Sequence, residues 1–123
     1  MEKIVSEDHS PLGRHIIADF FKSENLDDLE FIKGALVDAA KAAGATVLGS
    51  NFHKFSPQGV TGYVLLAESH ISIHTWPEHG YAAADIFTCG KLNPQAAFDF
   101  LKLKLGAGSV QIKDFQRGVE SPE

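Results

Sequence analysis

The chain has 123 residues, of which 44% are hydrophobic, an ordinary composition for a single globular domain with one core. Eleven basic residues against sixteen acidic ones give a net charge of −5, and without a dense basic cluster this argues against nucleic acid as a partner. One cysteine cannot form an internal disulfide, and residues 1–12 contain no apolar run typical of a signal peptide or a membrane span. We therefore expect one domain, residues 1–123, in the cytoplasm.

Alternating and helical spacings of apolar residues predict six strands and two helices. Asn25 and Asn93 are the expected N-caps of the helices, because an asparagine side chain accepts hydrogen bonds from the first free backbone N–H groups. Gly44 is expected to end the first helix. In chain order we expect a strand at 12–21, a helix at 26–43, strands at 45–55, 60–67, 69–75 and 81–89, a helix at 93–105 and a strand at 109–116.

The predicted order βαββββαβ belongs to the α+β class. Both helices are expected to pack on one face of a single antiparallel sheet, because each amphipathic helix has one apolar face to bury. This two-layer arrangement leaves the other face of the sheet open, and a second copy of the chain could cover it.

The stretch 67–90 contains the only tryptophan, the only cysteine, three of the six histidines and a serine that directly follows a glutamate. Two alternating strands separated by a loop with proline and glycine predict an antiparallel hairpin here. The simplest register places Thr75 opposite Tyr81. Ser69 and Cys89 then share one face at roughly 7–8 Å, the spacing of diagonal neighbours in a sheet.

Three segments of this stretch, 68–70, 74–78 and 87–90, read Glu-Ser-His, His-Thr-Trp-Pro-Glu and Phe-Thr-Cys-Gly. These segments resemble the short prokaryotic S-adenosylmethionine decarboxylase proenzymes. The resemblance extends from Leu12 to about Arg117 and covers nearly the whole chain.

The resemblance implies that the chain is cut between Glu68 and Ser69 into a β chain, residues 1–68, and an α chain, residues 69–123. Ser69 would become a pyruvoyl group, a covalent cofactor that forms a Schiff base with the substrate amine and stabilises the carbanion left by carbon dioxide. The implied activity converts S-adenosylmethionine into the aminopropyl donor for spermidine and polyamine synthesis.

Further roles follow from the same resemblance. Cys89 is the implied proton donor in decarboxylation, and His74 is the implied acid and base in self-processing. Thr61 stands where the family uses a serine to assist processing, and it keeps the hydroxyl. An aromatic face suits adenine and a sulfonium charge, and a carboxylate can accept both ribose hydroxyls. The implied substrate contacts of these kinds are Phe55, Trp76 and Glu78.

A distance estimate divides these residues between two chains. His74 lies five residues beyond Ser69, about 16 Å along an extended strand, and on the opposite face. We therefore predict a symmetric dimer in which one protomer supplies Glu68, Ser69 and Cys89 while its partner supplies His74 and Glu78. A bulge between Ser69 and His74 would remove the reason for this prediction.

Two alternatives stay open at this point. The pyruvoyl chemistry would also serve another amino acid, such as arginine or ornithine, and an unprocessed homologue would act as a nucleoside-binding or partner-binding module. No metal site is expected, because His70 and His74 would lie about 13 Å apart on a strand, too far to share an ion.

Overall fold

Six antiparallel strands form one sheet in the spatial order β2-β3-β4-β5-β1-β6. The computed structural model describes residues 11–67 and 69–120. The elements confirm the predicted order βαββββαβ. Their bounds are β1 (Gly13–Phe21), α1 (Leu29–Ala42), β2 (Val47–Lys54), β3 (Val60–Leu66), β4 (Ser69–Trp76), the 3-10 turn η1 (Pro77–His79), β5 (Tyr81–Cys89), α2 (Pro94–Lys104) and β6 (Ser109–Arg117).

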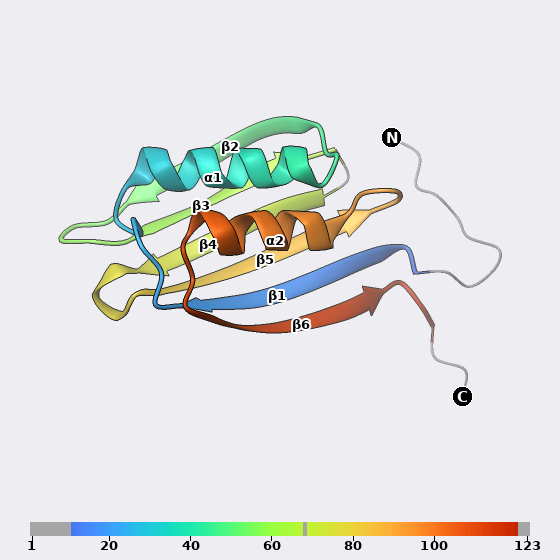
Figure 1. The fold of residues 1–123 in the computed structure, drawn as a ribbon. Helices are drawn as coiled ribbons and strands as arrows, with labels where there is room; N and C mark the ends of the chain where they lie inside the picture. Colours follow the sequence, from blue (N-terminus) through green and yellow to red (C-terminus); the bar gives the residue numbers. More distant parts are fainter. Residues whose placement is uncertain (1–10, 68, 121–123) are drawn as a thin grey trace.

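Both helices lie on one face of the sheet, α1 over β2 and β3 and α2 over β5 and β1 (Figure 1). The side chains between the two layers are aliphatic and buried, among them Leu36 of α1, Leu101 of α2 and Ile71 of β4. Burying one such side chain contributes about 1.5–3 kcal/mol, so these contacts hold the layers together. Within the described residues, neither helix is long and apolar enough to cross a membrane.

The first helix begins later than predicted. Its N-cap is Asp28, whose carboxylate accepts a hydrogen bond from the N–H of Phe31 at 3.1 Å. Asn25 instead adopts a left-handed conformation, with φ of 60°, and turns the chain so that Leu26 is buried before the helix starts. The prediction of Asn25 as a cap is wrong. Asn93 is confirmed as the cap of α2, since its side chain accepts from the N–H of Ala96.

The face of the sheet opposite the helices carries no second layer among the described residues (Figure 1). Five large apolar side chains on this open face are 41–47% exposed, and they come from four of the six strands. An apolar surface of this extent is typical of an interaction site. The five residues are Ile17, Tyr63, Leu65, Trp76 and Phe115.

The register of the hairpin formed by β4 and β5 differs from the predicted one by one residue. Trp76, rather than Thr75, lies opposite Tyr81, because η1 and the glycine after it reverse the chain in one residue fewer than expected. A slip of one residue moves side chains to the other face of a sheet. Ser69 therefore lies on the helix side and Cys89 on the open face. The prediction that these two residues share a face is wrong.

Candidate functional site

The residues predicted to form the site lie at opposite ends of β4 and its neighbouring strands. Ser69 and Cys89 mark one end, which we call the cysteine end. β4 pairs with β3 and β5 without a register shift, so the eight residues from Ser69 to Trp76, seven steps of about 3.3 Å, span about 23 Å. One chain therefore carries two separate groups of site residues. The second group, at what we call the tryptophan end, comprises Phe55, Thr61, His74, Trp76 and Glu78.

Ser69 is the first residue of β4 and pairs with Leu66 of β3. Its hydroxyl oxygen is buried and has no hydrogen-bond partner among the described residues. Leaving such a group unpaired costs about 1–3 kcal/mol, and buried side-chain oxygens in folded proteins rarely lack a partner. Glu68, on the other side of the predicted cleavage point, lies outside the described residues.

Cys89 ends β5, is partly buried and lies opposite Gly13 of β1. The ring of Phe87, two residues earlier on the same face, crosses over Gly13. A Cβ atom at position 13 would meet the Cε1 atom of this ring at 2.6 Å. Position 13, which lies opposite Cys89, therefore needs a glycine to leave room for the Phe87 ring.

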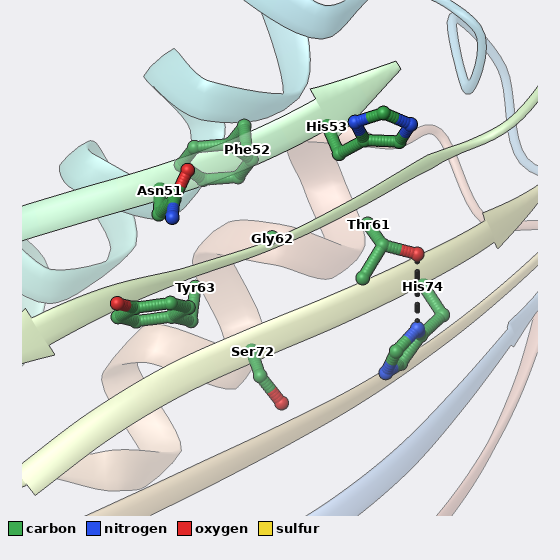
Figure 2. A pocket seen from close by; sticks show the side chains of 8 residues that line it. All are labelled: Asn51, Phe52, His53, Thr61, Gly62, Tyr63, Ser72 and His74. Atoms are coloured by element: carbon green, nitrogen blue, oxygen red, sulfur yellow. Dashed lines mark hydrogen bonds between the residues drawn. The ribbon is translucent and has the colours of Figure 1, made fainter. Parts of the chain in front are cut away.

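Thr61 and His74 are direct neighbours on β3 and β4. The Oγ1 atom of Thr61 lies 3.0 Å from Nδ1 of His74, and Figure 2 shows the two side chains pointing toward one another. They border a shallow hollow of about 320 Å³ on the open face. The structure thus brings together the two residues predicted to assist processing. The hollow is lined by Asn51, Phe52, His53, Thr61, Gly62, Tyr63, Ser72 and His74.

Phe55 is 46% exposed on the loop between β2 and β3. Its N–H donates to the carbonyl of Gly59 at 2.8 Å, and the N–H of Gly59 donates to Oδ1 of Asp27 at 2.8 Å. Lys54 lies 3.0 Å from the same carboxylate oxygen. The hydrogen bond from Gly59, and then the contact with Lys54, hold the pKa of Asp27 below its usual value of 3.8. Asp27 thus fixes the loop that carries Phe55.

Trp76 is 41% exposed and belongs to an aromatic stack. Its ring lies 5.3 Å from that of Tyr81, which also stacks on Phe21 at 5.3 Å. The hydroxyl of Tyr81 donates to Asp19 at 2.6 Å, and this hydrogen bond, together with burial, raises the pKa of Tyr81 to about 12. The stack fixes the orientation of the tryptophan ring, and Glu78 follows on η1 with an exposed side chain.

A carboxylate of β5 joins neighbouring strands on the open face. Oδ1 of Asp85 accepts hydrogen bonds from Nε2 of His15 at 2.8 Å and from Nε2 of His70 at 2.9 Å, and Oδ2 accepts one from the hydroxyl of Ser72. Arg117 donates to Nδ1 of His15 at 3.0 Å. Burial tends to raise the pKa of Asp85, but the bonds from Ser72, His15 and His70 outweigh it and leave the pKa below 3.8. We call these five residues the Asp85 cluster.

The sequence gives only part of the signal for this cluster. Strand alternation places His70 and Ser72 on one face, but the predicted register sets Asp85 opposite Ile71 and so on the other face. His15 comes from β1, 70 residues before Asp85, and no local pattern predicts that β1 inserts between β5 and β6. The sequence therefore predicts only a surface or structural residue at position 15, whereas the structure places His15 in a hydrogen-bonded network.

The residues at the cysteine end fit a pyruvoyl group better than a metal ion. Within residues 11–67 and 69–120, no group of three His, Cys, Asp or Glu side chains could hold a metal. A pyruvoyl group made from Ser69 instead requires a serine hydroxyl that can attack the preceding carbonyl. Among the described residues the Ser69 oxygen has no hydrogen-bond partner that would hold it away from that attack.

Comparisons with known proteins identify the family of the chain. Residues 14–118 match the family model described as S-adenosylmethionine decarboxylase. The S-adenosylmethionine decarboxylase proenzyme of Acidithiobacillus ferrooxidans is 47% identical over 110 residues, which cover 87% of this chain and 83% of that protein. The corresponding proenzyme of Clostridium tetani is 48% identical over 111 residues, 88% of each chain.

A solved structure shows the same fold. The crystal structure of the adenosylmethionine decarboxylase from Aquifex aeolicus VF5 superimposes with a TM-score of 0.83 at 39% identity, over 93% of this chain and 97% of that one. Both the sequence matches and this likeness extend over nearly the whole chain. The chain therefore belongs to the family of S-adenosylmethionine decarboxylase proenzymes.

Proposed function

We propose that the chain cuts itself between Glu68 and Ser69 and then decarboxylates S-adenosylmethionine. The observation that carries this proposal is the buried hydroxyl of Ser69 at the start of β4, which has no hydrogen-bond partner among the described residues. The Ser23 oxygen is buried and unpartnered in the same way, but only Ser69 follows the glutamate of the family motif, and its hydroxyl stays available to a base that would take its proton. The names of the relatives supply the substrate. The product would donate aminopropyl groups in polyamine synthesis.

Self-cleavage uses atoms of the chain and one water molecule. The Ser69 oxygen attacks the carbonyl carbon of Glu68, an ester forms, and the amide bond breaks to leave the nitrogen of residue 69 as an amine. Loss of the Cα proton expels the Glu68 carboxylate from Cβ, and water then replaces the nitrogen, which departs as ammonia. The products are a chain of 68 residues and, since 123 minus 68 is 55, a chain of 55 residues that begins with a pyruvoyl group.

The site residues then divide the work of decarboxylation. The pyruvoyl ketone supplies the electron sink that takes the substrate amine and accepts the electron pair left by carbon dioxide. Cys89 holds the proton that the substrate carbon receives. Phe55 and Trp76 offer exposed aromatic faces to the adenine and the sulfonium, and Glu78 offers a carboxylate to the ribose hydroxyls.

Two copies of the chain complete the site in this proposal. His74 lies about 16 Å from Ser69 along a regular strand, so it cannot act on the serine of its own chain. A two-fold axis that sets the two open faces together, with the strands of the two sheets in opposite directions, brings each tryptophan end to the cysteine end of the partner. Because the Ser69 side chain lies on the helix side, the partner's His74 would act in processing on the backbone at residue 69, where the Cα proton is lost, and not on the hydroxyl. Packed sheets lie about 10 Å apart, within reach of side chains from both layers. Such a homodimer also buries the exposed apolar residues of the open face.

Cleavage itself accounts for how residue 69 meets Cys89 from the helix side of the sheet. In the uncut chain, bonds on both sides hold Ser69 in its strand. After cleavage, residue 69 is attached only to His70, so its two carbonyl groups can rotate about the strand end. Cys89 lies at the same end of the sheet, since His70 and Phe87 are direct neighbours. Rotation at this strand end would bring residue 69 to the face that carries Cys89.

An intact mass spectrum of purified protein under denaturing conditions tests the cleavage. We expect two fragments divided after Glu68, the second without a free amino terminus, together with release of carbon dioxide from S-adenosylmethionine. Ser69→Ala should remove both the fragments and the decarboxylation while leaving a folded protein. Decarboxylation by that variant would contradict the pyruvoyl mechanism.

Two other outcomes point to different functions. Cleaved protein that releases carbon dioxide from arginine or ornithine, and not from S-adenosylmethionine, would assign the same chemistry to another amino acid. A single species near 13.3 kDa that binds S-adenosylmethionine would instead identify a binding module.

A further inference from the structure

The Asp85 cluster forms a directional chain of hydrogen bonds in which the polar groups satisfy one another. Arginine can only donate, so Nδ1 of His15 accepts from Arg117 and the ring carries its proton on Nε2. That nitrogen donates to Asp85, as does Nε2 of His70, and Ser72 donates to the second carboxylate oxygen. A connected network of this kind holds its members in one arrangement.

The same cluster encloses the ring of Phe87. His15 stacks on this ring with centroids 5.0 Å apart, and the centroid of His70 lies 5.8 Å away. The guanidinium of Arg117 lies over the ring, 5.4 Å from its centroid, and makes a cation–π contact. Phe87 is therefore held by three members of the cluster, two residues before Cys89.

The position of His70 gives the cluster its importance. His70 is the only residue to which position 69 stays bonded once the chain is cut, and its backbone pairs with Phe87. Its side chain lies on the open face, the face of Cys89, and is tied there to Asp85. Asp85 itself lies about 13 Å from Cys89 along the strand, too far to contact the thiol directly.

We propose that Asp85 is a positioning residue for the new chain end: it fixes His70 against Phe87 and so holds residue 69 within reach of Cys89 after cleavage. This inference rests on the self-cleavage proposed above. In the uncut chain the connection to β3 also holds Ser69, whereas the cut chain depends on the strand pairing and on this anchor. Loss of Asp85 should therefore affect decarboxylation more than self-cleavage.

Asp85→Asn tests this order of effects. The amide leaves one acceptor oxygen for the two histidine donors and removes the negative charge that strengthens both bonds, and the Ser72 hydroxyl must accept from the amide nitrogen instead of donating. We expect the half-time of self-cleavage, followed by intact mass, to change by no more than about threefold, and kcat to fall about tenfold or more with KM nearly unchanged. A second readout is independent of turnover: in the cleaved variant, backbone amides of residues 70–72 should exchange hydrogen faster than in the cleaved wild type.

Two control variants separate positioning from general loss of stability. Asp114→Asn removes a carboxylate of the same sheet that pairs with Arg14, and it should leave cleavage, kcat and exchange at the start of β4 unchanged. Ile86→Val, next to Asp85 but buried under the helices, should lower the midpoint of thermal unfolding without lowering kcat.

A third variant removes the hydrogen bond between His70 and Asp85 by changing the histidine. His70→Phe keeps an aromatic ring beside Phe87 but loses the bond to Asp85, so it should reproduce the loss of kcat and decides the test if Asp85→Asn does not fold. Combining the two substitutions should cost no more than one alone. Wild-type kcat and exchange in these variants, or a loss of cleavage as large as the loss of kcat, would overturn the inference. The proposed self-cleavage would survive either result, because it depends only on whether the wild-type chain is cut.

Discussion

The two ends of the sheet are built differently, although the chain reaches both along the same strand. From the middle of the sheet toward the cysteine end, polar side chains bond to one another through Asp85, and the serine proposed to react is buried. At the tryptophan end, aromatic and charged side chains are exposed around His74 and are supported from behind by Asp27 and Tyr81. The difference suits the proposed mechanism, in which one end stays in place after the cut while the other end receives the substrate and the second copy of the chain.

Two carboxylates anchor these regions, Asp85 in the middle of the sheet and Asp27 beside the loop of the tryptophan end, and in both the pKa lies below the usual range. Asp85 accepts from side chains of β1 and β4, so it couples strands. Asp27 accepts from the backbone of Gly59, so it shapes a loop. Strand position and loop shape are thus controlled separately, which makes the two ends separable by substitution.

The largest expected effect comes from mixing chains that are defective at different ends. Ser69→Ala and His74→Ala should each fail to cleave when expressed alone. Random pairing on co-expression makes about half of the dimers mixed, each with one intact pair of ends, so about one quarter of wild-type cleavage should return. Intact mass of the co-expressed protein measures the fraction that has been cut.

In a matched control, both co-expressed chains carry Ser69→Ala. Co-expression of Ser69→Ala with the double variant Ser69→Ala/His74→Ala should give no cleaved chain, because no dimer then contains the nucleophile. Cleavage in the first mixture that does not exceed the sum of the separate variants would refute a site shared between chains.

A smaller effect is expected at the loop of the tryptophan end. Asp27→Ala removes the acceptor that ties Gly59, so the loop carrying Phe55 should lose its fixed position. One hydrogen bond contributes about 1 kcal/mol net, so we expect KM for S-adenosylmethionine to rise about fivefold. Steady-state kinetics checks this, with self-cleavage at the wild-type rate.

The control for that loop is an exposed carboxylate on α1. Asp38→Ala changes the net charge by the same amount without touching the loop, so its KM should equal that of the wild type. An equal rise in KM for Asp27→Ala and Asp38→Ala would assign the effect to charge rather than to loop position.

The smallest expected effect is on the pKa of Tyr81, whose ring stacks on Trp76. The folded-state pKa of Tyr81, about 12, lies above its usual 10.0, so the neutral form is favoured; this contribution to stability is complete below pH 10 and is lost as the pH rises through 12. In a Tyr63→Phe background, phenolate absorbance should follow Tyr81 alone. Asp19→Asn should move its midpoint toward 10.0, and an unchanged midpoint would rule out the hydrogen bond as the cause.

Local sequence patterns predicted the elements better than their exact pairing. The spacing of apolar residues located both helices and all six strands, because burial of one face requires that spacing. The predicted cap of α1 was wrong by a few residues. The predicted register of the hairpin was wrong by one residue. Both errors arise at turns, where backbone conformation at residues such as Asn25 and Gly80 decides the outcome and side-chain pattern gives little guidance.

The sequence by itself determined the family motif, the α+β order and the separation of Ser69 from His74, since distance along a regular strand follows from residue number. Only the tertiary structure decided which face carries Cys89 and which residues surround Asp85. The cluster depends on β1 lying between β5 and β6, with His15 and Arg117 brought to Asp85 from distant parts of the chain. Such contacts form because the packing of the two helices on the sheet fixes the strand order. That packing is a property of the whole chain, and no short segment encodes it.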